Sequence, residues 1–183
     1  MGQPKPLLPL GNRTVIRYCL DTIIAAGLRD VIVVVGPESD EIAAPLSGLP
    51  VVIVKNESSE SEMIASVRIG LRALEGHASG VLICLTDHPL ISADTLAALV
   101  RGHQVTPDKI IIPAYRGKRG HPTLFPGSVI EEVFSGGNLR DVIRKDPARV
   151  RIIDVGDEGV VLDMDTREDY EKIVRTFAAR KGL

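Results

Sequence analysis

The sequence is poor in cysteine and lacks a long apolar run, and both absences narrow the class of protein. Its two cysteines, Cys19 and Cys84, form neither a Cys-x-x-Cys pair nor the Cys/His spacing of a zinc site. Both fall inside apolar patterns, as expected of buried, reduced thiols. No apolar stretch approaches the length of a membrane span, and no charged leader precedes a short apolar segment. We therefore expect a cytoplasmic protein with no membrane association.

A strong excess of charge of one sign is also absent. The formal net charge is -2, with 44% hydrophobic and 25% charged residues, which is ordinary for a globular protein. Bulk electrostatics therefore does not indicate a nucleic-acid partner, although a locally basic site remains open. The 183 residues show no repeat or linker. We expect a single domain over residues 1–183, large enough to bury a core.

Several common catalytic motifs are missing from the sequence. It contains no Gly-x-x-x-x-Gly-Lys phosphate loop, Gly-x-Gly-x-x-Gly, His-Glu-x-x-His or Gly-x-Ser-x-Gly. Kinase, dinucleotide-binding and serine-hydrolase interpretations therefore lose support.

What the sequence does contain is an alternation of helix and strand patterns. An amphipathic helix is expected at 14–28 and a strand buried on both faces at 30–35. Further helices are expected near 40–46, 61–74, 92–103, 128–134, 139–144 and from 166 onward, with strands near 51–54, 80–85, 109–113, 149–155 and 160–162. This order predicts an α/β fold with a mostly parallel central sheet and helices on both faces.

Two stretches depart from the alternation. The first clear element is a helix, whereas a doubly wound sheet usually opens with a central strand, so the first strand is expected to be missing. Residues 115–125 are glycine-rich and basic, and we expect a loop or hairpin laid over the end of the sheet.

Carboxylates follow two of the predicted strands. In open α/β sheets ligands bind outside the carboxyl ends of the strands. Asp87 follows the 80–85 strand, and Asp163 and Asp165 follow the 160–162 strand, where period-two alternation would point both to one side. Mg²⁺ prefers such oxygen ligands and relieves the repulsion between close carboxylates. The alternatives are that Asp87 only caps a turn and that Asp165 only caps the last helix.

Cationic and polar side chains supply further candidates. Lys5 lies between prolines that could aim it at a phosphate, although a solvated lysine is the ordinary alternative. In the loop 116–122, Lys118, Arg119 and His121 could neutralise an acceptor phosphate, and glycines permit close approach. A solvated hairpin is the alternative there. The polar segment 56–66 could contact a base or ribose, or form a plain loop and helix cap.

Taken in order, these segments resemble the molybdenum cofactor nucleotidyltransferases, the MobA-like NTP transferases, and most closely their cytidylyltransferase branch. The resemblance is carried by residues 1–11, Asn56 with 63–71, Leu85-Thr-Asp-His-Pro-Leu90, Arg119-Gly-His-Pro122 and Leu162-Asp-Met-Asp-Thr-Arg-Glu-Asp-Tyr170. The family's opening strand and glycine-rich loop are absent, which we interpret as a start at an internal methionine, with genuine loss of both segments as the alternative. Glu62 and Gly136-Gly-Asn-Leu-Arg140 also depart from the pattern.

The resemblance implies a Rossmann-like nucleotidyltransferase fold and a reaction. An acceptor phosphate oxygen would attack the α-phosphorus of an NTP, CTP being favoured over GTP, and release pyrophosphate. The acceptor would be a small phosphorylated compound such as molybdopterin. The implied roles are Lys5, Asp87 and Asp163 in catalysis, Asp87, Asp163 and Asp165 at Mg²⁺, Lys5, Asn56, Ser66, Thr86 and Asp87 at the nucleotide, and Lys118, Arg119, Gly120 and His121 at the acceptor.

Two other functions stay open at this point. One is a sugar-phosphate or alcohol-phosphate nucleotidyltransferase of the same fold. The other is a nucleotide-binding, chaperone-like partner of a molybdoenzyme that does not turn over.

Overall fold

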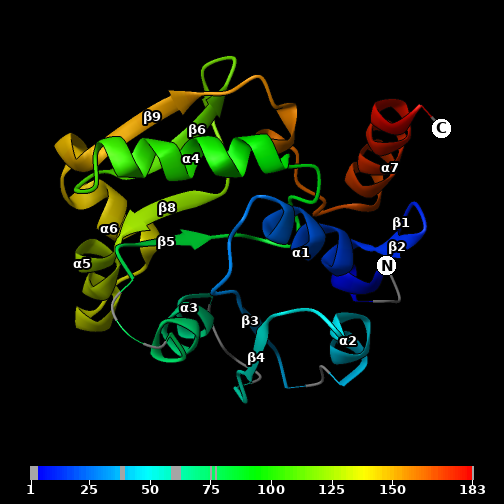
Figure 1. Ribbon diagram of the computed structural model, residues 1–183, viewed down its shortest axis with the longest axis horizontal. Helices are drawn as coiled ribbons and strands as arrows, with labels where there is room; N and C mark the ends of the chain where they lie inside the picture. The colour runs from blue at the N-terminus through cyan, green and yellow to red at the C-terminus, as the bar shows by residue number, and fades with distance from the viewer. Residues whose placement is uncertain (1–3, 38–39, 59–62, 75, 77, 183) are drawn as a thin grey trace.

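The computed structural model describes residues 4–37, 40–58, 63–74, 76 and 78–182. Figure 1 shows a mixed α/β arrangement in which both labelled ends of the chain lie on the same side of the molecule. Within the described residues, no helix is both long enough and apolar enough to cross a bilayer.

The larger sheet has five strands and is mixed in direction. Its strands are β5 (Gly80–Ile83), β6 (Ile110–Tyr115), β7 (Lys118–Arg119), β8 (Thr123–Pro126) and β9 (Val150–Asp154). The order is β5-β8-β6-β7, with β9 pairing with β6. β9 is parallel to β6, whereas the β5–β8, β6–β8 and β6–β7 pairs are antiparallel. The sheet is therefore less parallel than the alternation alone predicts.

Helices cover both faces of this sheet, as predicted. Ile111 of β6 packs with Leu99 of α4 (Ala93–Val105) and with Leu124 of β8. Ile110 and Ile112 point the other way, into a core shared with α3 (Met63–Arg72), α5 (Gly127–Ile130), η3 (Glu131–Ser135) and α6 (Leu139–Lys145). Because successive strand side chains alternate between faces, a strand apolar at every position requires this two-sided cover.

A second, smaller sheet carries β3 (Ile32–Val35) and β4 (Val52–Lys55), which pair in parallel. Between them in sequence lie α2 (Asp40–Ala43) and η2 (Ala44–Leu46). Helix α3 lies against β3, where a Cβ on Gly70 would sit 3.1 Å from Cγ2 of Val34. Among the described residues no ladder joins β3 to β5, so each has one strand edge without a backbone partner.

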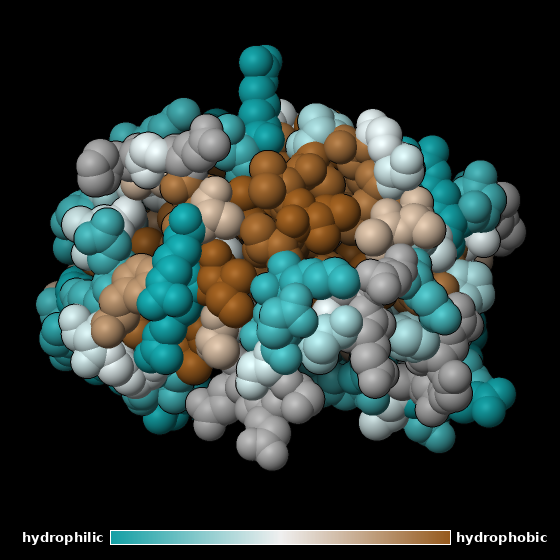
Figure 2. Space-filling view, turned by 90° about the horizontal axis from the view of Figure 1, so that it is seen from below, coloured by the Kyte–Doolittle hydropathy of each residue, from teal (hydrophilic) through white to brown (hydrophobic). Residues whose placement is uncertain are grey.

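Apolar surface is visible on the side of the molecule where β3 and β4 lie. Figure 2, seen from that side, shows it gathered around the middle of the view. Val52 and Ile53 of β4 are 53% and 38% exposed. β4 thus begins with apolar residues at the margin of its sheet, and these two side chains are partly open to solvent.

The two ends of the chain pack together. Residues 5–14 form η1 (Lys5–Leu7) and a hairpin of β1 (Pro9–Leu10) and β2 (Arg13–Thr14), followed by α1 (Val15–Ala25). Gly11 at the hairpin turn has φ +64°, and a Cβ there would lie 2.8 Å from the Phe177 ring of α7 (Arg167–Lys181). Leu10 and Phe177 share one core with Met164. This packing brings the first and last candidate segments to the same region.

Two predicted elements are corrected by the structure. Residues 160–162 are not a strand, because η5 (Glu158–Val161), a 3-10 helix, occupies most of them. The 115–125 stretch does contain the predicted hairpin, β6 to β7, but Thr123–Pro126 is a central strand, β8. β8 is difficult to recognise in the sequence because prolines stand at both of its ends and both of its faces are buried, so no polar and apolar alternation remains. The short η4 (Pro147–Arg149) leads into β9.

Candidate active site

Asp87 lies in the turn that follows β5. Its side chain is 32% exposed. Its Oδ1 atom is buried and has no hydrogen-bond partner among the described residues. A buried carboxylate oxygen without a partner is unfavourable, so this atom is suited to receive a cation or a donor from a ligand.

The next residue, His88, joins Asp87 to the basic loop. The His88 side chain is buried, and its Nε2 lies 3.8 Å from Asp87 Oδ1. Its ring faces the ring of His121, with centroids 4.9 Å apart and planes inclined by 43°. Sequence reasoning misses His88, whose only signal is its place within Thr86-Asp-His-Pro89.

A backbone contact holds His121 against η5. The His121 N–H donates to the Val160 carbonyl at 2.8 Å. At the preceding residue, Gly120, a Cβ would lie 2.1 Å from the same Val160 carbonyl oxygen. Gly120 therefore serves close backbone approach, and it brings His121 toward the carboxylates that follow η5.

The electrostatics of His121 show which charged groups surround it. Burial lowers the pKa of His121, and the neighbouring His88 lowers it further. The carboxylates of Asp87 and Asp163 raise that pKa and so oppose the lowering. Asp87 and Asp163, which are far apart in sequence, therefore both lie within electrostatic range of one imidazole.

Asp163 and Asp165 flank a buried anchor. Met164 is fully buried, while both aspartates are exposed. The period-two alternation expected of a continuing strand does not apply here, because 160–162 is not a strand. Asp165 Oδ1 pairs with Lys5 Nζ at 2.8 Å, across 160 residues of sequence. Thr166, rather than Asp165, is the N-cap of α7. The alternative that Asp165 only caps the last helix is therefore wrong. Lys5 has Asp165 as a specific partner.

The predicted nucleotide segment is tied together by Asn56 and Ser66. Asn56 is buried at the end of β4, and its Nδ2 donates to Ser66 Oγ on α3 at 3.0 Å. Its Oδ1 accepts from the Ser58 N–H at 3.2 Å. Thr86 is exposed beside Asp87. Glu62, a departure from the family pattern, lies outside the described residues.

The basic loop is divided between two environments. Lys118 and Arg119 form β7, and both are exposed with no ion pair among the described residues. Because neighbouring strand residues point to opposite faces, their side chains diverge. Lys118 and Arg119 are therefore not both placed to contact one acceptor. The one whose side chain lies on the same face as His121 is the better candidate.

The two cysteines border the site without entering it. Burial raises the pKa of the Cys19 thiol and of the Cys84 thiol to about 12 in each case. Together with Thr22 and His88 they line a cavity of about 20 Å³, close to the space that one water needs. Both cysteines are thus thiols of low reactivity, as the sequence predicts.

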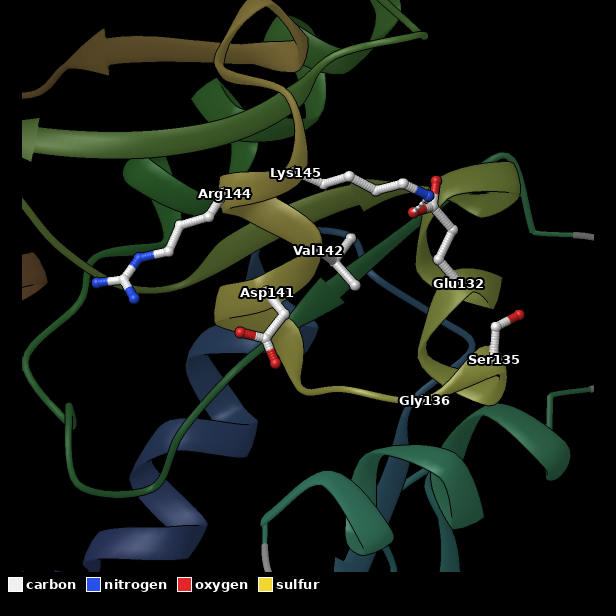
Figure 3. A pocket seen from close by; sticks show the side chains of 7 residues that line it. All are labelled: Glu132, Ser135, Gly136, Asp141, Val142, Arg144 and Lys145. Carbon is white, nitrogen blue, oxygen red and sulfur yellow. Dashed lines mark hydrogen bonds and ion pairs between the residues drawn. The ribbon is translucent and has the colours of Figure 1, made fainter.

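A cavity of about 520 Å³ lies elsewhere, between η3 and α6, and Figure 3 shows its lining. Its charged groups are largely engaged within the protein. Lys145 Nζ pairs with Glu132 Oε2 at 2.9 Å, and Asp141 belongs to the capping box with Asn138. In Figure 3 the Arg144 side chain extends away from the other labelled side chains. None of the candidate residues Asp87, His121 and Asp163 lines this cavity.

Comparison with known proteins points to one family. The family described as "MobA-like NTP transferase domain" matches residues 1–150. The chain is 29% identical over 182 residues to a protein named nicotine blue oxidoreductase from Paenarthrobacter nicotinovorans, covering 93% of this chain and 88% of that protein.

Solved structures agree with this match. The crystal structure of Rv0371c from Mycobacterium tuberculosis H37Rv superposes with a TM-score of 0.82 at 28% identity, covering 96% of this chain and 90% of that one. A complex of Rv0371c with manganese from the same organism matches with a TM-score of 0.73 at 27% identity, covering 95% and 93%. The Rossmann-like α/β fold predicted from the sequence is confirmed.

Proposed function

Since the chain belongs to the MobA-like NTP transferase family and is a nucleotidyltransferase, we propose that its donor is CTP and its acceptor a molybdopterin-type phosphate. The observation that carries this proposal is the contact of His121, the histidine of the Arg119-Gly-His-Pro122 segment, with His88 beside Asp87, and Asp163 also lies within electrostatic range of the His121 imidazole. That segment resembles the cytidylyltransferase branch, which favours CTP over GTP.

The reaction requires positioning and neutralisation of charge more than a covalent nucleophile. An acceptor phosphate oxygen forms a bond to the α-phosphorus while the bond to the pyrophosphate oxygen breaks. Both reactants are anionic, so cationic groups must hold them in line at short distance. Lys5 would neutralise the triphosphate, and Arg119 with His121 would orient the acceptor phosphate.

The carboxylates suit a divalent cation such as Mg²⁺. Within the described part of the chain, no group of three or more His, Cys, Asp and Glu side chains is arranged to hold a metal ion. Mg²⁺ commonly binds through one or two carboxylates and completes its shell with phosphate and water. Asp87, with its unpartnered Oδ1, and Asp163 would be those ligands. The ion would supply charge neutralisation at the phosphates. Asp165 is not included among these ligands because it is already paired with Lys5.

The nucleoside would be bound at the other sheet. Asn56 and Ser66 join the end of β4 to α3, so they fix the local backbone. Because the side-chain oxygen and nitrogen of Asn56 already have partners, we assign it to shaping the nucleoside site and Ser66 with Thr86 to direct contact.

A relative named as an oxidoreductase raises a second candidate function, a redox activity. The sequence lacks the glycine-rich dinucleotide fingerprint, so the transferase remains the preferred function.

Pyrophosphate release tests the proposal directly. The chain is incubated with Mg²⁺ and either CTP or GTP, and with molybdopterin, a sugar phosphate or an alcohol phosphate. Release with CTP and molybdopterin, lost in Asp87→Asn, is the expected result. Release only with another acceptor supports the broader nucleotidyltransferase. Nucleotide binding without release indicates a binding protein, and consumption of a nicotinamide cofactor instead indicates the redox activity.

A further inference from the structure

We propose that His88 is a positioning residue that holds the Asp87 carboxylate and the His121 ring in a fixed relation. The inference rests on the proposed function, in which Asp87 serves the metal and nucleotide and His121 serves the acceptor. His88 would then keep the two halves of the site in register.

The placement of His88 restricts its ring. Its side chain is 8% exposed, and it is followed by the buried Pro89. One ring face meets His121 at 4.9 Å between centroids, and the Nε2 edge faces Asp87 Oδ1 at 3.8 Å. One buried side chain therefore touches both halves of the candidate site by different parts of its surface.

The use of a histidine here is itself informative. His88 Nδ1 and Asp87 Oδ1 are both buried without hydrogen-bond partners among the described residues. A buried nitrogen without a hydrogen-bond partner is unfavourable by about 1–3 kcal/mol. An apolar ring would fill the same space without that cost. Polarity at this position is best explained by its nearness to the unpartnered carboxylate oxygen.

His103 provides an internal comparison. It is 7% exposed in α4, and both of its ring nitrogens are also buried without partners among the described residues. A Cβ on Gly80, at the start of β5, would lie 2.7 Å from its Nε2. Unpartnered nitrogens therefore do not by themselves identify a functional histidine, and the neighbours Asp87 and His121 distinguish His88 from His103.

Two substitutions separate the two contacts. His88→Phe keeps a ring against His121 and removes the nitrogen facing Asp87. His88→Gln keeps an amide nitrogen near the place of Nε2 and removes the ring. His103→Gln is the matched control, because it removes a histidine of equal burial at the opposite end of β5.

Binding is measured by NMR on protein carrying ¹⁵N-labelled histidine, with Mn²⁺ and inorganic phosphate as probes. Phosphate is followed by the shift of the His121 signal and Mn²⁺ by its broadening. We expect His88→Phe to weaken Mn²⁺ binding and His88→Gln to weaken phosphate binding, each on the order of tenfold. The control should leave both dissociation constants unchanged.

Kinetic measurements should separate the two variants in the same way. His88→Phe should raise the Mg²⁺ concentration needed for half-maximal rate, and His88→Gln should raise the KM for the acceptor. Equal effects of both variants on both quantities, or no response of His121 to phosphate in the unchanged protein, would overturn the inference. If the binding split is found but no acceptor releases pyrophosphate, the positioning role stands and the proposed function fails.

Discussion

At the scale of single residues, the candidate site is a convergence of unlike groups from distant parts of the chain. Asp87 follows β5, His121 follows β7 and Asp163 follows η5, and the two carboxylates act on the one imidazole. Lys5 reaches the same region through its ion pair with Asp165. Removing individual charges should therefore affect reaction more than folding.

Asp87→Asn and Asp163→Asn should each lower turnover by about a hundredfold or more, because each removes a carboxylate that would hold the divalent cation balancing the phosphates in the transition state. Asp87 Oδ1 has no hydrogen-bond partner to lose among the described residues, so the thermal midpoint should hardly move. Turnover and melting are measured in parallel, with exposed Asp94→Asn on α4 as control. Full activity in both site variants would contradict the assignment.

Arg119→Ala should raise the KM for the acceptor about tenfold and leave the KM for CTP nearly unchanged. The reason is that Arg119 lies two residues from His121, on the side proposed for the acceptor, and removal of a binding contact raises KM. Arg101→Ala, exposed on α4, is the control. The reverse pattern of KM changes would mean that the two halves of the site are interchanged.

At the scale of elements, η5 is the piece on which the site depends. It places the Val160 carbonyl against Gly120 and His121 on one side, and Asp157 at its start binds α4 and α7 on the other. The sequence predicts a strand here, since Val160-Val161-Leu162 is apolar throughout and begins with two β-branched residues. The helical turn instead forms because the Asp157 side chain caps it, accepting from the Gly159 N–H at 2.9 Å.

Gly120→Ala should displace His121 and destabilise the fold by about 1–3 kcal/mol, as expected of overpacking against backbone. A Cβ there would lie 2.1 Å from the Val160 carbonyl oxygen. Gly156→Ala is the control, since a Cβ at that position would have no neighbour within 4 Å among the described residues and its φ is ordinary. Denaturant unfolding of both variants checks this, and equal stability would refute the close approach.

Asp157 should make stability depend on acid pH. Burial raises the pKa of Asp157, but hydrogen bonds from Ser92, Gly159 and Thr95 outweigh burial and lower it below its ordinary value. Arg180 adds an ion pair at 3.2 Å. A lowered pKa in the folded state stabilises the protein above the unfolded value of about 3.9, and this stabilisation is lost as the pH falls through the folded value.

Asp157→Asn should therefore lower the free energy of unfolding by about 1.5–3 kcal/mol near neutral pH. The difference from the unchanged protein should shrink as the pH falls below about 4, where the aspartate of the unfolded chain protonates, and should vanish once the pH passes the lowered folded pKa. Urea unfolding at several pH values measures it. A difference that stays constant with pH would show that the contribution is packing rather than charge.

At the scale of the whole molecule, the sequence predicts most of the architecture and only part of the site. Long periodic segments such as α1, α4 and α7 can be recognised from their hydrophobic pattern, and so can the position of Asp87 after a strand. The sequence predicts Asp163 after a strand as well, but it follows the 3-10 helix η5. β8 lacks such a signal because it is short, proline-bounded and buried on both faces. His88 lacks one because its importance comes from His121, which is distant in sequence and adjacent only after folding.

The division of the sheet has a consequence for how the molecule opens. Because no ladder joins β3 to β5 in the described part of the chain, the β3–β4 pair is held to the rest chiefly by side-chain packing. Units held in this way unfold locally at lower free energy than the global transition. Amide protons of β3 and β4 should therefore exchange with deuterium well before those of β6, β8 and β9. The proposed donor CTP, by bridging Ser66 of α3 to Asp87, should slow exchange in the smaller sheet most of all.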